Sequence, residues 1–95
     1  MPEREFEWDE TKAAENSARH SGVTFESAKG VFRDPRAIEF IDNRYDYGEE
    51  RLVLIGMSQG EVLTVVYTER EDRARIISAR RATRLEADEY FRQSD

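Results

Sequence analysis

Three side chains of this sequence are candidates for moving a proton: His20, Glu50 and Tyr67. His20 is the single histidine, and histidine is the residue whose ordinary pKa lies nearest to neutrality. A general acid–base role on a ribose hydroxyl or on a leaving oxygen would suit it. His20 also stands at the expected end of a helix, where its ring could instead interact with the last carbonyl groups. Residue type leaves both roles open.

Arginine supplies most of the positive charge, with 13 Arg against 2 Lys. Between residues 70 and 84 there are six Arg and two acidic residues, which gives this stretch a charge of +4. Arg80 and Arg81 fall where the last expected strand meets the last expected helix, close to free backbone N–H groups. This pair is a candidate phosphate site, because a guanidinium binds phosphate with two parallel hydrogen bonds. One of the two could instead pair with a carboxylate such as Glu86.

These residue types fit RNA cleavage without a metal. That reaction needs a group that deprotonates a 2′-hydroxyl, cations that stabilise the pentavalent phosphorane, and a group that protonates the 5′-oxygen. Arginine suits the second task, and its high pKa makes it poor at the other two. The sequence has no cysteine, no phosphate-binding loop and no metal-ligand spacing. We therefore expect no cofactor and no metal.

Length and composition predict one domain, residues 1–95, in a chain of 95 residues. The net charge of −6 argues against a nucleic acid partner, but acidic residues gather near the N-terminus and basic ones in the C-terminal third. A basic face on an acidic domain could also be only a solvated surface. No apolar stretch at the start resembles a signal peptide, and none is long enough to span a membrane. We expect a cytoplasmic protein.

Periodicity predicts an α+β fold in the order β-α-α-β-β-β-β-α, in which two early helices pack on an antiparallel sheet and a terminal helix closes it. Asp9 and Thr24 are the expected N-caps of the first two helices, and Thr83 with Glu86 has the spacing of a capping box. Asp34-Pro35 should end the second helix. The expected strands cover residues 6–8, 37–41, 51–57, 61–68 and 73–79.

The aromatic residues divide into two groups. Trp8 and Tyr67 are expected in the core, whereas Tyr45 and Tyr47 fall in a polar loop, where they could stack on bases or contact a partner.

Several motifs resemble those of one family. The opening Phe6-Glu7-Trp8-Asp9-Glu10 with Lys12 and Asn16, and the block from His20 through Gly22 to Ala28, look like the start of BrnT proteins. Similar matches occur at residues 31–35 (VFRDP), 48–56 (GEERLVLIG), 65–70 (VVYTER) and 75–82 (RIISARRA). The resemblance covers nearly the whole chain.

The resemblance implies a RelE-like fold and an endoribonuclease that arrests translation as the toxin of a type II toxin–antitoxin system. It also implies a cognate antitoxin of the BrnA kind, which carries a DNA-binding region, so that operator DNA is reached only through the antitoxin. The residues that it marks as site candidates are His20, Glu50 and Arg80 for catalysis and Arg51, Arg75 and Arg81 for RNA phosphates.

Two other interpretations stay open. The chain could be a catalytically weak or inactive subunit that binds an antitoxin and tunes repression of the operon. It could also be a plain α+β domain whose arginines only form surface ion pairs. If Arg75, Arg80 and His20 lay on different faces, the ribonuclease interpretation would lose its site.

Overall fold

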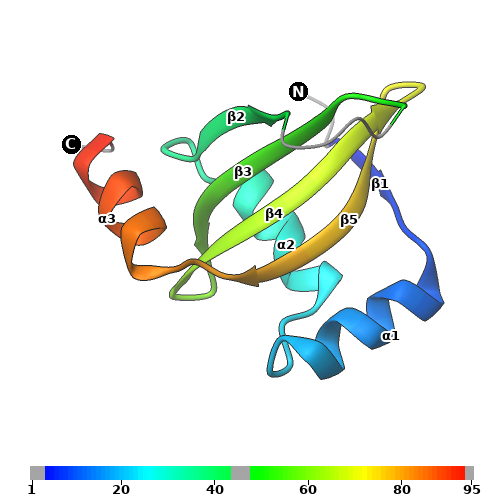
Figure 1. Ribbon diagram of the computed structural model, residues 1–95, viewed down its shortest axis with the longest axis horizontal. Helices are drawn as coiled ribbons and strands as arrows, with labels where there is room; N and C mark the ends of the chain where they lie inside the picture. Colours follow the sequence, from blue (N-terminus) through cyan, green and yellow to red (C-terminus); the bar gives the residue numbers. More distant parts are fainter. Residues whose placement is uncertain (1–3, 44–47, 94–95) are drawn as a thin grey trace.

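The computed structural model describes residues 4–43 and 48–93 (Figure 1). The order of elements in this part of the chain is the predicted one. The elements are β1 (Glu5–Glu7), α1 (Glu10–Arg19), α2 (Phe25–Phe32), β2 (Ile38–Asp42), β3 (Arg51–Ser58), β4 (Glu61–Arg70), β5 (Arg73–Arg81) and α3 (Arg84–Gln93). Tyr45 and Tyr47 lie outside the described residues.

The predicted helix starts are confirmed by their hydrogen bonds. The Asp9 carboxylate accepts from the Lys12 N–H, and the Thr24 hydroxyl accepts from the Ser27 N–H. At α3 the capping box is complete: the Glu86 N–H donates to Thr83 Oγ1, and the Thr83 N–H donates to Glu86 Oε1. Local signals were sufficient here because a cap involves neighbouring residues only.

The five strands form one sheet in the order β1-β5-β4-β3-β2, with β4 at its centre as its apolar run predicts. The expectation of an antiparallel sheet was wrong for β1, which pairs with β5 in parallel. The register sets Glu5 opposite Arg73 and Glu7 opposite Arg75, so acidic and basic side chains meet across this pair. A three-residue strand carries no sequence signal of its direction.

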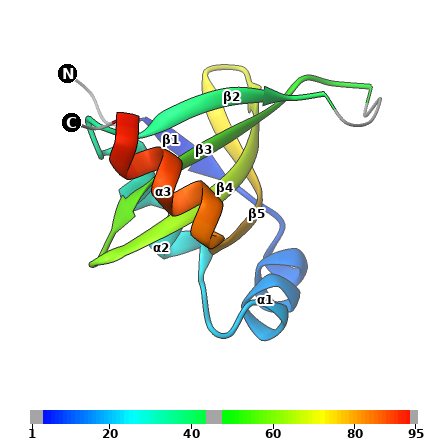
Figure 2. The ribbon, with the colours of Figure 1, turned by 60° about the vertical axis from the view of Figure 1, so that its left-hand side comes forward.

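The main core lies between the sheet and α2, which crosses one face (Figure 1). Phe25, Ala28 and Val31 of α2 are buried there against Val65 and Tyr67 of β4. The prediction that both early helices pack on the sheet was only partly right. Helix α1 lies beside β5 and projects from the body of the fold (Figures 1 and 2). The small residues of α1 do not specify which edge it meets.

Helix α3 covers part of the opposite face (Figure 2). Tyr90 packs there with Val53 and Ile55 of β3, and its hydroxyl donates to Asp34 Oδ2 at 2.5 Å. The same carboxylate oxygen accepts from the Met57 N–H at 2.7 Å. Between α3 and α1 this face stays open, and we refer to it as the open face.

A β-bulge interrupts the pairing of β4 with β5. Val66 is opposite Ser78, but the next residue of β4, Tyr67, is opposite Ile76. Ile77 is therefore the extra residue of β5. As a result Ile76 and Ala79 are both buried on the α2 side, and Ser78 is on the open face with Val66.

Candidate active site on the open face

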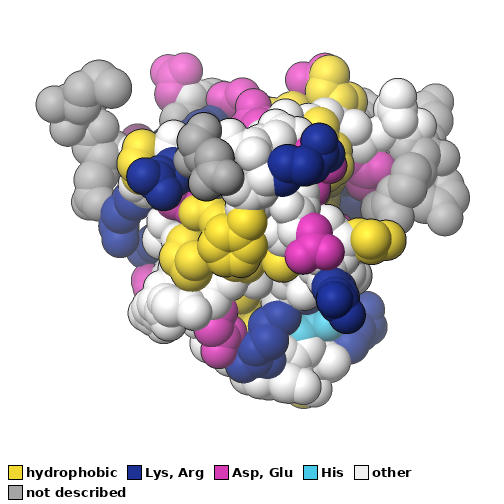
Figure 3. Space-filling model, turned by 90° about the vertical axis from the view of Figure 1, so that its left-hand side faces the viewer, with side chains coloured by type: hydrophobic (Ala, Val, Ile, Leu, Met, Phe, Trp, Pro, Cys, Tyr) yellow, Lys and Arg dark blue, Asp and Glu magenta, His cyan; other side chains and the backbone are white. Residues whose placement is uncertain are grey.

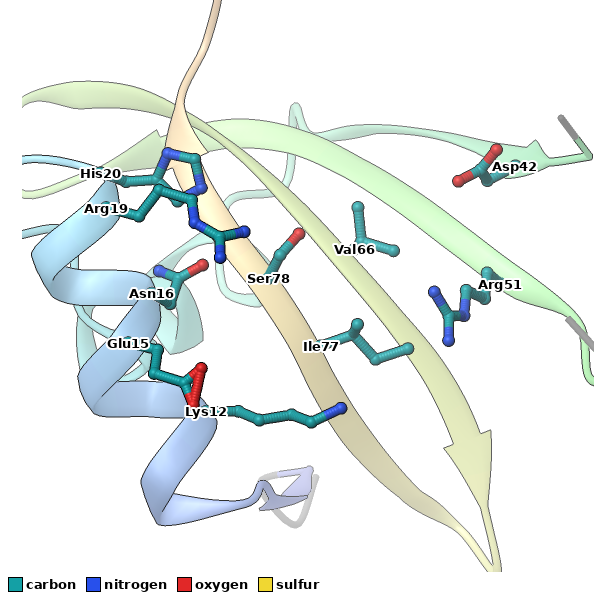
Figure 4. Close-up of a pocket in the computed structure, with 10 residues that line it drawn as sticks. All are labelled: Lys12, Glu15, Asn16, Arg19, His20, Asp42, Arg51, Val66, Ile77 and Ser78. Carbon is teal, nitrogen blue, oxygen red and sulfur yellow. The ribbon is translucent and has the colours of Figure 1, made fainter. Parts of the chain in front are cut away.

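A cavity of about 370 Å³ lies between α1 and the open face of the sheet (Figure 4). Helix α1 forms one wall, and β5, β4 and the facing ends of β3 and β2 form the floor and the far side. The lining residues are Lys12, Glu15, Asn16, Arg19, His20, Asp42, Arg51, Val66, Ile77 and Ser78. Both Ile77 and Ser78 reach it because of the bulge.

Two further hollows continue from this cavity. One, of about 330 Å³, shares Asp42 and Val66 with it and extends toward α3. The other, of about 410 Å³, shares Arg19 and His20 with the first and Arg80 with the second. We call the three together the groove, with a central hollow, an α3 hollow and an Arg80 hollow. Such concave, continuous surfaces are where ligands bind most often.

Asn16 attaches α1 to the sheet and so sets one wall of the groove. Its side chain is 7% exposed, and it bonds to both backbone groups of Ala79, donating to the carbonyl at 2.7 Å and accepting from the N–H at 3.2 Å. It also donates to the Val23 carbonyl at 3.3 Å. The Asn16 side-chain amide thus pairs with Ala79 of β5 as the peptide group of a neighbouring strand would. This buried amide is conspicuous only in the structure, because its partners are 7 and 63 residues away.

His20 is the C-cap of α1, and its backbone N–H donates to the Asn16 carbonyl. Ser21 and Gly22 then turn the chain with φ angles of +53° and +86°, so Gly22 adopts the left-handed conformation that often ends helices. Within the described residues the imidazole makes no hydrogen bond. It lines both the central hollow and the Arg80 hollow, where a ligand could reach it.

Lys12 and Arg19 are two cations of the groove that were not predicted as site residues. Both side chains extend from α1 into the central hollow (Figure 4), and neither has an ion-pair partner within the described residues. A signal was present in the sequence: Lys12, Asn16 and His20 are spaced at i, i+4 and i+8, which places them on one face of a helix. The predicted candidate Arg51 enters the same hollow from β3.

Arg80 forms an ion pair with Glu86, which confirms the alternative that one arginine of the Arg80–Arg81 pair binds this carboxylate. Its two terminal nitrogens donate to the two carboxylate oxygens at 2.7 and 2.9 Å. These bonds from Arg80, together with bonds from Thr83 and Thr64, lower the pKa of Glu86 to about 2 despite its partial burial. Arg81 pairs with Glu61 at 2.9 Å and lines the Arg80 hollow. Arg80 is therefore a fixed charge and Glu86 its fixed counter-charge.

The remaining predicted residues lie elsewhere. Arg75 pairs with Glu7 at 2.8 Å beside β1, and Glu50 lines a small hollow with Thr68 and Glu69. Neither lines the groove. Tyr67 is buried in the core, as predicted, and its hydroxyl donates to Glu39. Burial, followed by the bond to that carboxylate, raises the pKa of Tyr67 well above its ordinary value of 10.0.

The groove therefore combines the imidazole of His20 with several cationic side chains. Figure 3 shows the single histidine between Lys or Arg side chains on the face that it presents. Cations at these positions can hold a phosphate and stabilise charge that builds on it, and an imidazole beside them can exchange a proton. In the described part of the chain, no three His, Asp or Glu side chains gather as a metal site.

No helix in the described residues is long and apolar enough to cross a membrane. No curated protein matches the chain. The family model described as "Ribonuclease toxin, BrnT, of type II toxin-antitoxin system" matches residues 8–86, which include α1, α2, the sheet from β2 to β5, the first turn of α3 and every described residue of the groove. The chain thus belongs to the BrnT family of ribonuclease toxins of type II toxin–antitoxin systems.

Proposed function

We propose that this chain is an endoribonuclease that cleaves mRNA without a metal ion and that the groove is its active site. The observation that carries the proposal is the convergence of His20, Arg19, Lys12 and Arg51 on the central hollow of the groove. These side chains come from a helix and from the opposite part of the sheet, so only the fold brings them together. Their residue types match the needs of RNA cleavage through the 2′-hydroxyl.

In the proposed reaction the 2′-oxygen attacks the adjacent phosphorus and the bond to the 5′-oxygen breaks. The products are a 2′,3′-cyclic phosphate and a 5′-hydroxyl. His20 accepts the proton of the 2′-hydroxyl and returns it to the departing 5′-oxygen, so that protons and charge balance. Arg19 and Arg51 face the phosphate and stabilise the negative charge that accumulates on it in the transition state.

Arg80 is assigned to a phosphate next to the cleaved one, because it lies where two hollows of the groove meet. Arg81, at the outer rim, extends the positive surface. The proposal makes no use of Glu50 and Arg75, which do not line the groove.

The proposal includes the partners that the family implies. A type II system pairs its toxin with a protein antitoxin. A BrnA-like antitoxin with a DNA-binding region would neutralise this chain in the cytoplasm, and operator DNA would be bound through that antitoxin. A RelE-like fold is part of the same proposal, and the sheet with its open face is compatible with it.

A second candidate function is that of an inactive subunit that binds an antitoxin and tunes repression. The observation in its favour is that five arginines of the basic stretch are paired with carboxylates. The pairs are Arg70–Glu49, Arg73–Glu5, Arg75–Glu7, Arg80–Glu86 and Arg81–Glu61. Carboxylates in these positions compete with RNA phosphates for the same guanidinium groups.

Induced expression with and without the neighbouring antitoxin gene, followed by mapping of RNA ends, tests the proposal. We expect growth arrest and new 5′-hydroxyl ends in the absence of the antitoxin, also when the purified protein is assayed with EDTA. His20→Ala and Arg19→Ala should each lower cleavage about 100-fold or more, the typical contribution of an acid–base or charge-stabilising group.

Arg73→Ala is the matched control, because it removes an arginine of the same stretch that pairs with Glu5 and Glu7 outside the groove. Its cleavage rate should equal that of the wild type. A folded wild-type protein that binds the antitoxin but cleaves no RNA would favour the second candidate. Full activity of His20→Ala would overturn the assignment of the proton carrier.

A further inference from the structure

We infer that the α3 hollow of the groove is the binding site for one nucleobase of the RNA, with the ring of Phe40 stacked on that base. This inference rests on the proposed function, because it places a base beside the phosphates that the groove binds. The described lining of this hollow comes from β2, β3, β4, β5 and α3.

The first observation is the exposure of Phe40. Phe40 is 48% exposed on the edge strand β2, opposite Val53 on β3. Val53 and Val66 form an apolar floor beside it, and the cavity measures about 330 Å³. That volume is in the range of sites for small organic ligands. An aromatic ring at the wall of such a cavity offers a flat face to a planar ligand.

The second observation is continuity with the cationic part of the groove. The α3 hollow shares Val66 with the central hollow and Arg80 with the Arg80 hollow. A nucleotide whose phosphate lies at Arg80 therefore has open space for its base on the Phe40 side. Single-stranded RNA is recognised mainly in this way, with bases stacked on aromatic rings and phosphates bound by cations.

The charges around the α3 hollow favour a base over a second phosphate or an apolar peptide. Its carboxylates, Asp42 and Glu86, outnumber its one cation, Arg80, and would repel a second phosphate, whereas in the central hollow Lys12, Arg19 and Arg51 outnumber Glu15 and Asp42. An apolar helix or strand of a partner would have to cover these carboxylates and Arg80 together, at a cost in desolvation. A base has polar edges that can hydrogen-bond to such groups while its faces stack.

The test is binding of a short, fluorescently labelled single-stranded RNA with 2′-O-methyl groups, which block the attacking oxygen so that it is not cleaved. Phe40→Ala should weaken binding about 10-fold, in line with the loss of one stacked base. Phe40→Trp should bind as tightly as the wild type, since it keeps an aromatic face.

Phe91→Ala is the matched control, because Phe91 is an aromatic residue of α3 with 53% exposure that does not line the groove. It should bind like the wild type. A series of RNAs with a single abasic position should contain one position at which removal of the base weakens wild-type binding about 10-fold and at which Phe40→Ala causes no further loss.

The outcomes separate this inference from the proposed function. If the wild type binds no RNA, both fail. If the wild type binds and Arg19→Ala weakens binding but Phe40→Ala and every abasic RNA leave it unchanged, only the base site is overturned. It is also overturned if Phe40→Ala weakens binding of the purified antitoxin and leaves RNA binding unchanged, since the hollow would then be a protein docking surface.

Discussion

At the scale of single residues, the fixed pair of Arg80 and Glu86 is the most constrained polar feature of the groove. Glu86 Oε1 accepts from Arg80, from Thr64 and from the Thr83 N–H, so one carboxylate joins β5, β4 and the first turn of α3. Glu86 has a structural role as a helix cap and a functional one as the group that orients Arg80. A phosphate at Arg80 must bind to a guanidinium that is already occupied on one edge.

The lowered pKa of Glu86 predicts a specific pH dependence of stability. Its pKa falls from an ordinary value of 4.5 to about 2, chiefly through the bonds from Arg80. Its stabilising contribution is therefore complete above about pH 4.5 and is lost as the pH falls toward 2. In urea unfolding between these pH values, the wild type should lose more stability than Glu86→Gln, so the two curves should converge at low pH.

Glu71→Gln is a suitable control for that comparison, since Glu71 is exposed in the turn between β4 and β5. Its unfolding curve should follow that of the wild type across the same range. Parallel curves for Glu86→Gln and the wild type would contradict the role given to the Arg80 bonds.

At the scale of elements, the sequence predicted what depends on neighbouring residues. Asp9, Thr24 and Thr83 marked the helix starts, because each cap is completed within three residues. The direction of β1 and the position of α1 depend on distant partners, Arg73 and Ala79, that no local pattern identifies. The same limit applied to the site, where the arginines were evident but their pairing with carboxylates was settled only by the fold.

The contact of α2 with the β3–β4 hairpin gives a prediction at this scale. Gly30 is inside α2, where alanine would ordinarily be more stable by roughly 1 kcal/mol. A Cβ at Gly30 would lie 2.3 Å from Ser58 Oγ and 2.9 Å from Ser58 Cβ. Gly30→Ala should therefore destabilise the fold by about 1–3 kcal/mol, as overpacked positions do. Urea unfolding measures this change.

Changing Ser58 supplies the control. In a Ser58→Gly background both of the close atoms are gone, and the nearest remaining atom, the Cα of residue 58, is 3.6 Å away. The effect of Gly30→Ala should change sign there and become a gain of about 0.5–1 kcal/mol. A loss of the same size in both backgrounds would show that the Ser58 contact is not the cause.

At the scale of the whole molecule, an acidic chain presents a local positive surface. The acidic residues of β1 are opposite the arginines of β5, so much of the basic stretch is neutralised within the fold. Lys12 and Arg19 of α1 remain without ion pairs in the described residues and face the groove. The net charge of −6 therefore says little about the groove itself.

Salt dependence of RNA binding measures this local charge. If the groove neutralises three phosphates, the cleaved one at Arg19 and Arg51, the next one at Arg80 and a third at Lys12, a plot of log K against log salt should have a slope of about −2, since each phosphate of a single strand contributes about −0.7. Arg19→Ala should make the slope less steep by about 0.7. Fluorescence anisotropy with 2′-O-methyl RNA at several salt concentrations gives these values.

Arg73→Ala again serves as the reference, because Arg73 pairs with Glu5 and Glu7 away from the groove. Its slope should match that of the wild type. An equal change in slope for Arg73→Ala and Arg19→Ala would mean that RNA responds to the overall charge of the protein rather than to the groove.

The bulge at Ile77 makes the length of β5 as important as its composition. Side chains before it follow one alternation, with Ala74 and Ile76 buried, and those after it follow the opposite one, with Ala79 buried. If β5 kept its length but paired regularly with β4 at this point, Ile77 would be opposite Val66, and Ser78 and Arg80 would turn toward the core with no change in either residue type. The extra residue therefore decides which face of the sheet Ser78 and Arg80 occupy. Homologous chains that keep Ser78 and Arg80 at the groove should therefore have either this bulge or a strand that is one residue shorter, but not a regularly paired strand of the same length.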